Sequence, residues 1–149
     1  MSTIADPNVR AACRDRILRL DPNARAKWGR MTAPQMVCHL NDSFRVGMGE
    51  KYASPASNLL QRTLVKWIAL RAPLQWPHGV PTRPEIEQGR GGTPPSDWER
   101  DRAELLALID DFAGRETFGA HPTFGKMSQS DWLAWGYRHV DHHLRQFGA

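Results

Sequence analysis

Cysteine is scarce in this sequence, which contains only Cys13 and Cys38 in 149 residues. Two cysteines at this spacing make neither a disulfide framework nor a zinc knuckle, so we expect no disulfide-stabilised secreted scaffold. Long apolar runs are also absent, since the longest, around Leu64 to Leu70, is interrupted by Lys66. The N-terminal stretch MSTIADPNVR lacks the apolar core of a signal peptide. These absences predict a cytoplasmic protein with no membrane-spanning segment.

Positive charge is only slightly in excess, with 20 lysines and arginines against 16 aspartates and glutamates and a formal net charge of +4. A nucleic-acid-binding domain typically gathers its basic residues into a stripe or patch. Here the basic residues are scattered among acids, as in RDR at 14–16 and ERDRAE at 99–104. This pattern is typical of solvated helix faces, so we expect no nucleic-acid partner.

The length and overall composition favour a single folded domain. A chain of 149 residues has the usual size of one domain, and 40% apolar with 24% charged residues is ordinary globular composition. The apolar content is too high for a natively disordered chain. We therefore expect one hydrophobic core in one domain that spans residues 1–149.

Capping residues followed by apolar residues at helical spacing mark the helical segments. Thr32 with Gln35, and Ser96 with Glu99, have the spacing of capping boxes, in which two side chains satisfy two backbone N–H groups reciprocally. The predicted helices run from Asp6–Pro7 to about Leu20, from Thr32 to Gly47 or Gly49, from Ser54–Pro55 to Pro73, from Ser96 to Gly114, and from Ser128 to Gly148. No strand alternation competes with them, so we expect an all-α fold, best accommodated as a four-helix bundle.

The middle of the chain adds two further expectations. The helix after Ser54–Pro55 presents an apolar face made of Leu59, Leu60, Leu64, Trp67 and Ile68. From residue 73 to 95 the chain is rich in proline and glycine and lacks periodicity, which predicts a long crossover loop. Such a loop is either functional or mobile, or it wraps over a bundle end. An exposed stripe near Trp67 and Leu70 could pair two copies, so monomer and homodimer both stay open.

The last predicted helix contains a histidine pair with the spacing of metal ligands. His139 and His143 lie four positions apart, so both rings can point at one ion from the same helix face. A helical wheel places His142 on the opposite side, facing water. Catalytic metals commonly have three protein ligands, and His39 flanks the apolar face of the second helix, where a bundle could bring it opposite the pair. Spacing alone also permits these histidines to be packed or surface residues.

Three segments of the chain carry a resemblance to a known group of proteins: WGRMTAPQMVCHLNDS at 28–43, HPTFGKMSQSDW at 121–132 and YRHVDHHLRQFG at 137–148. Together they resemble the DinB/YfiT-like superfamily, and most closely a branch known only as a domain of unknown function. The likeness follows the chain in order over nearly its whole length, although the middle loop carries little of it. It implies a four-helix bundle in which one histidine of the second helix and an H-x-x-x-H pair of the last helix hold a metal ion.

Carried over residue by residue, the ligands that the resemblance implies are His39, His139 and His143. The implied ion is a divalent transition metal suited to imidazole, such as zinc or nickel. Characterised superfamily members include metal-dependent transferases for low-molecular-weight thiols, such as bacillithiol and mycothiol, and a maleylpyruvate isomerase. We therefore expect a metal-dependent transferase or hydrolase whose partner is a small molecule such as a low-molecular-weight thiol.

Several roles stay open at the level of sequence. A non-catalytic protein that binds a metal or small ligand during stress is one alternative to an enzyme. Association with nucleic acid, suggested by the DNA-damage name of the superfamily and the positive charge, is another. His121, in the segment HPTFG, could act as an acid or base at the open metal position or belong to a rigid turn. Asp42 and Asp141 could orient ligand imidazoles or be solvated helix residues.

Overall fold

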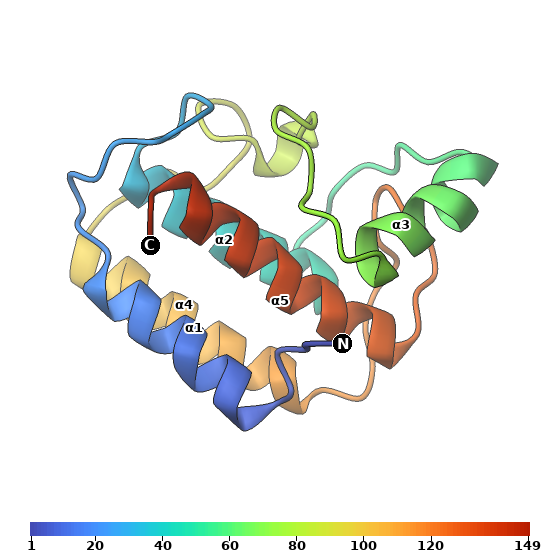
Figure 1. Cartoon of the computed structure of the whole chain (residues 1–149). Helices are drawn as coiled ribbons and strands as arrows, with labels where there is room; N and C mark the ends of the chain where they lie inside the picture. Colours follow the sequence, from blue (N-terminus) through green and yellow to red (C-terminus); the bar gives the residue numbers. More distant parts are fainter.

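The computed structural model describes residues 1–149 and contains four long helices and one short one (Figure 1). The helices are α1 (Pro7–Arg19), α2 (Ala33–Gly47), α3 (Lys66–Arg71), α4 (Trp98–Gly114) and α5 (Gln129–Gln146). Helix α2 packs against α4 and α5, and α1 packs against the same two helices. The chain has no strand, only an isolated bridge between His121 and Gly125, so the all-α prediction is confirmed. None of these helices combines the length and apolarity needed to cross a membrane.

Side-chain caps start three of the long helices where the sequence predicts them. The carboxylate of Asp6 accepts the N–H of Asn8 at 2.8 Å at the start of α1. At α2, Thr32 Oγ1 accepts the N–H of Gln35 while Gln35 Oε1 accepts the N–H of Thr32, which completes the capping box. Ser128 caps α5 as predicted, and the carboxylate of Asp131 accepts the N–H of Ser128, which completes a second capping box. Short-range chemistry therefore determines these three starts.

Helix α4 begins one residue later than predicted. Asp97, not Ser96, is its cap, and Asp97 Oδ1 accepts the N–H of Arg100 at 2.8 Å. The buried carboxylate of Asp101 accepts the backbone N–H and the hydroxyl of Ser96, at 2.9 and 3.2 Å. Asp101 thus engages Ser96, and the predicted capping box with Glu99 does not form.

The core lies between the long helices and is rich in aromatic side chains. Phe112 of α4 packs edge-on against Phe44 of α2, with ring centroids 4.8 Å apart, and also contacts Trp132 and Trp135 of α5. A Cβ at Gly47 would lie 2.9 Å from the Trp132 ring, so only glycine permits this approach of α2 to α5. Buried apolar residues of the long helices and their C-terminal ends include Met36, Val37, Leu40, Phe44, Met48, Leu105, Ile109, Phe112, Trp132, Val140, Leu144 and Phe147.

The third helical segment starts later than predicted, and Leu70 is buried although the sequence predicted an exposed stripe near Trp67 and Leu70. Ser54 and Pro55 lie in extended chain, and helical conformation begins after Asn58, whose side chain and that of Gln61 cap each other's backbone N–H at 2.9 Å. A π-helical stretch, Gln61–Val65, leads directly into α3. Its apolar face is largely uncovered, with Trp67 exposed as predicted, because this segment contacts only α5 among the long helices. Its exposed members are Leu59, Leu60, Leu64, Trp67 and Ile68.

The connection over residues 73–95 is irregular except for a 3₁₀ turn, η2 (Pro84–Ile86), as the predicted long loop requires. The turn packs against α2 and buries Ile86. Further along, the carboxylate of Asp42 accepts the backbone N–H and the hydroxyl of Thr93, both at 2.7 Å. These contacts fasten the loop along α2.

Candidate metal centre

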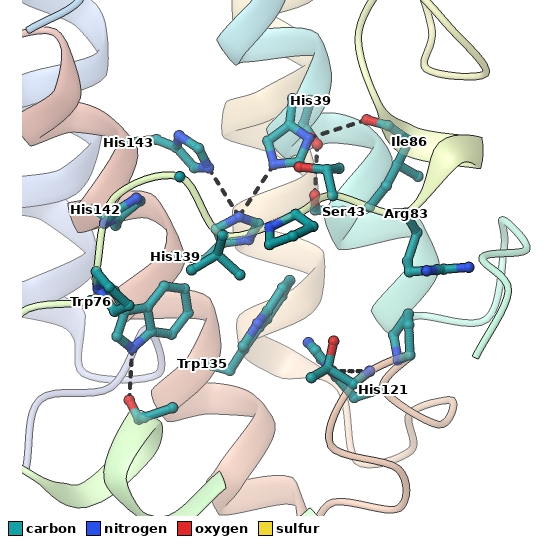
Figure 2. A pocket seen from close by; sticks show the side chains of 18 of the residues that line it. His39, Ser43, Trp76, Arg83, Ile86, His121, Trp135, His139, His142 and His143 are labelled. Carbon is teal, nitrogen blue, oxygen red and sulfur yellow. Dashed lines mark hydrogen bonds between the residues drawn. The ribbon is translucent and has the colours of Figure 1, made fainter. Parts of the chain in front are cut away.

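Helices α2 and α5 bring three imidazole rings to one point (Figure 2). His39 comes from α2, and His139 and His143 come from successive turns of α5. The Nε2 atom of His139 lies 3.3 Å from Nε2 of His39 and 3.1 Å from Nε2 of His143. One ligand nitrogen from each ring falls in a group whose members all lie within 4.8 Å of one another. The three histidines singled out from the sequence therefore meet, although 100 positions separate the first two.

A backbone carbonyl fixes the orientation of the His39 ring. Nδ1 of His39 lies 3.2 Å from the carbonyl oxygen of Ile86, in the loop that crosses α2. Because a carbonyl oxygen only accepts, Nδ1 must carry the proton and donate it. The lone pair of His39 is then on Nε2, which faces His139.

A side-chain amide does the same for His143. Nδ1 of His143 lies 2.8 Å from Oε1 of Gln146, while Nε2 of Gln146 donates to the carbonyl oxygen of Trp28 at 2.9 Å. The second bond orients the amide so that its oxygen faces the imidazole. His143 therefore also holds its proton on Nδ1 and presents the lone pair of Nε2. Gln146 was not predicted from the sequence, in which its one signal is its place about one turn after His143 on the same helix.

His139 lies between the other two rings, and its Nδ1 is buried without a hydrogen-bond partner. Burial lowers the pKa of His39, and it lowers the pKa of His139 and His143 well below the ordinary value, with further lowering from the neighbouring imidazoles. The three rings are therefore neutral near pH 7. At most one proton can lie among the three Nε2 atoms, so at least two lone pairs point into the shared space.

Converging neutral imidazoles are a donor set that could hold a divalent transition metal. Two nitrogens bound to a tetrahedral zinc ion at about 2.0–2.1 Å would lie about 3.3 Å apart. The Nε2 separations of 3.3 and 3.1 Å around His139 are close to this value. The proton-bearing Nδ1 atoms of the other two rings are held by carbonyl oxygens, as metal-bound histidines usually are. The residues present thus fit an ion in both spacing and tautomer.

The two aspartates considered as imidazole partners do not contact the triad. Asp42 is fully buried, and besides Thr93 it pairs with Lys51 at 3.1 Å. Asp141 forms ion pairs with Arg16 and Arg145. Neither carboxylate orients a ligand ring, and Asp42 is not solvated either, because the loop that it anchors covers it.

His142 is partly buried, in contrast to the prediction that it faces water. Its ring lies 5.5 Å from Trp28, 5.9 Å from Trp76 and 6.3 Å from His78, measured between centroids. His78 in turn stacks on Trp28 with a centroid distance of 3.7 Å. A helical wheel describes one helix in isolation, so it cannot show that the segments before α2 and after α3 fold over this side of α5 and cover His142.

The triad opens onto a cavity of about 650 Å³, a size typical of small-molecule sites. Its walls come from α2, α3, α5 and the loop at 73–95, and they are mainly apolar and aromatic. The lining tryptophans are Trp28, Trp76, Trp132 and Trp135. The long loop therefore forms part of a potential binding site and does not merely close one end of the helices.

His121 lies on the cavity wall, outside the triad, and organises a turn. Its Nδ1 accepts the backbone N–H groups of Thr123 and Phe124, both at 3.1 Å, and the His121–Gly125 bridge closes the turn. Burial lowers the pKa of His121 to about 3. The ring is therefore neutral, with its proton on Nε2. His121 therefore belongs to a turn, as one of the two alternatives predicted. An acid or base role for His121 stays a prediction, and only its Nε2–H group is free for that role.

Replacing His121 with asparagine should flatten the loss of stability in acid. The folded pKa lies below the unfolded value of 6.5, so the unfolded chain takes up the proton first, and stability falls as pH drops from 6.5 toward 3. Asparagine keeps an oxygen that accepts both N–H groups but does not titrate. Urea unfolding of metal-free protein measures this difference between pH 6.5 and 3. In that range the free energy of unfolding of the wild type should fall by about 1.4 kcal/mol per pH unit more than that of His121→Asn. Parallel stability curves would rule out the buried neutral ring.

Comparison with known proteins gives one family. No curated protein and no solved structure matches this chain. The model of a family described as "Protein of unknown function (DUF1569)" matches residues 6–149, which include every helix and all three histidines of the triad. The chain therefore belongs to the DUF1569 family.

Proposed function

We propose that this protein is a metal-dependent enzyme of the DinB/YfiT-like type, acting as a low-molecular-weight thiol transferase or a hydrolase. One observation carries the proposal: the Nε2 atoms of His39, His139 and His143 converge while carbonyl oxygens hold the protons of two rings on Nδ1. Without a cation, this arrangement leaves buried lone pairs facing one another. Zinc or nickel is the proposed ion, because both suit imidazole ligands.

The packing of the long helices supports the superfamily assignment. Helices α1 and α2 each contact both α4 and α5, and α4 contacts α5, as the members of a four-helix bundle would. The ligand positions also follow the superfamily pattern, with one histidine on the second helix and an H-x-x-x-H pair on the last. The short α3 and the loop at 73–95 are then additions that enclose the site.

Different residues of the protein have different roles in the proposed reaction. When bound, the ion supplies a positive charge that lowers the pKa of a thiol or water in its open position. Ile86 and Gln146 keep the ligand rings in the required tautomer. The tryptophan walls exclude water, which strengthens every electrostatic interaction inside the cavity.

Thiol transfer fits this cavity better than hydrolysis does. No aspartate or glutamate lines it, and Nδ1 of His121 is occupied by two backbone N–H groups. The site therefore offers no carboxylate to serve as a general base for water. A thiol depends less on such a base, because its ordinary pKa is far below that of water. The absence of a lining carboxylate also favours, as the second candidate, a protein that binds a metal or small ligand without turnover.

Metal loading followed by a substrate screen tests the proposal. The purified protein is stripped with a chelator, loaded with zinc or nickel, and examined by elemental analysis; one ion per chain is expected. Each form is then assayed with low-molecular-weight thiols and electrophiles, and turnover by the loaded protein alone supports the enzyme. Absence of a stoichiometric ion would end the proposal, and saturable ligand binding without turnover would establish the binding protein instead.

A further inference from the structure

The charges around the cavity are of one sign. Arginines Arg30 and Arg83 line it, and no carboxylate does. Burial lowers the pKa of His39, His121, His139 and His143, so these rings are neutral and add no charge to the cavity. A ligand that enters this space therefore meets apolar walls and positive charge.

Arg83 is the cation that the fold holds in place. Its Nη2 and Nε donate to the hydroxyl of Ser54 at 2.7 and 3.3 Å, and the side chain is partly buried. Figure 2 shows Arg83 on the cavity wall between Ile86 and His121. Arg30 lies at the exposed rim by comparison.

Arg83 lacks an ion pair, in contrast to Arg90, the other arginine of this loop. Arg90, seven residues later, pairs with Glu87 at 3.0 Å, whereas Arg83 forms no ion pair. Glu85 is near enough for the charge of Arg83 to contribute to the lowering of its pKa, after the larger effect of a hydrogen bond with Ser54. Glu85, however, does not line the cavity. The face of Arg83 toward the cavity has no anionic partner within the protein.

A partly buried guanidinium that forms no ion pair on its cavity side favours an anion there, and its planar fork matches a carboxylate in particular. The apolar part of the ligand would contact the aromatic walls, among them Trp76 and Trp135. These two requirements together describe a small molecule with a carboxylate at one end and an apolar body.

We propose that the cavity binds an apolar carboxylate whose carboxylate group is held by Arg83. The inference rests on the proposed function, since it names the substrate class of the same site. The carboxylate could belong to the electrophilic substrate or to a thiol cofactor. The apolar walls favour the former, and the experiment separates the two sources.

Matched probes test this inference without relying on turnover. Binding of 3-phenylpropionate and of its neutral amide is followed by tryptophan fluorescence and calorimetry, in metal-free and in zinc-loaded protein. The acid should bind about tenfold or more tightly than the amide in both forms, which corresponds to one charge-assisted contact. The measurement on metal-free protein does not depend on the ion. The preference for the acid can therefore be tested even if the protein binds no metal.

Variants assign the contact to a residue. Arg83→Gln should abolish the preference for the acid while leaving amide binding unchanged, which shows that the cavity is intact. Arg83→Lys should retain part of the preference, and Arg90→Gln, in the same loop but outside the cavity, should retain all of it.

Four results would overturn the inference. They are equal binding of acid and amide, no binding of either, a preference that survives Arg83→Gln, and a preference that appears only with zinc. Tighter binding of 3-mercaptopropionate than of 3-phenylpropionate to metal-free protein would instead assign the carboxylate to the thiol and overturn the choice of source.

Discussion

Replacing His139 with glutamine should lower the affinity for zinc or nickel by more than about 100-fold, because loss of a hydrogen-bond partner of a ligand alone costs 10–100-fold. His139 is the central ligand, whose Nε2 is near those of both His39 and His143. Without it, two imidazoles on different helices remain, and these are too few for a tight site. Isothermal titration of stripped protein with either metal measures the loss.

Two other substitutions on α5 serve as comparisons for the metal affinity of His139→Gln. Gln146→Leu keeps all three ligands but removes the acceptor that holds the Nδ1 proton of His143, so we expect an intermediate loss of about 10–100-fold. His142→Gln changes the adjacent histidine, which lies outside the triad, and should leave the affinity nearly unchanged. An equal effect of all three substitutions would show that α5 is merely perturbed, and no effect of His139→Gln would remove the proposed site.

Helix starts could be predicted from the sequence wherever the capping chemistry is local. Thr32 and Gln35 lie three positions apart and satisfy each other, so no distant residue needs to be known. The start of α4 shows the limit of this reasoning, because the buried carboxylate of Asp101 takes the groups that Ser96 would use. Competition of this kind depends on burial, which spacing does not reveal.

The third helical segment was predicted only in part, for a related reason. Its leucines follow a helical period, and periodicity normally indicates a face packed on the core. Here the segment stands beside the other helices and leaves Trp67 60% exposed, while Leu70 is buried. The period predicted the helix but not which face is covered, since burial depends on the path of the loops on either side.

For the candidate site, the histidine pair could be predicted and its supports could not. The spacing of His139 and His143 is a property of one helix. The place of His39 beside an apolar helix face, together with the resemblance to known proteins, supplied the third ligand. The partners that orient the rings are a backbone carbonyl at Ile86 and an amide at Gln146. A backbone carbonyl has no residue type to recognise, and its position depends on how the loop at 73–95 crosses α2.

Zinc or nickel should also stabilise the folded chain strongly. An ion that binds only the folded state adds about 4 kcal/mol to the free energy of unfolding when free metal stands about 1,000-fold above the dissociation constant. In a chain of 149 residues this corresponds to a rise in Tm of roughly 10 °C. The effect should be large because the ion replaces a buried arrangement in which lone pairs face one another. Thermal unfolding followed by circular dichroism, with and without chelator, measures it.

The variants already described make this shift specific. His139→Gln should show no rise with metal, while its metal-free stability stays within about 1 kcal/mol of wild type, since the glutamine amide can donate to one of the bare Nε2 atoms. Magnesium, which prefers oxygen ligands, should give no rise in either protein. If metal stabilises His139→Gln as much as wild type, the ion is bound elsewhere on the folded chain. The convergence of the three imidazoles would then need another explanation, because neutral rings with buried, opposed lone pairs do not stabilise a fold by themselves.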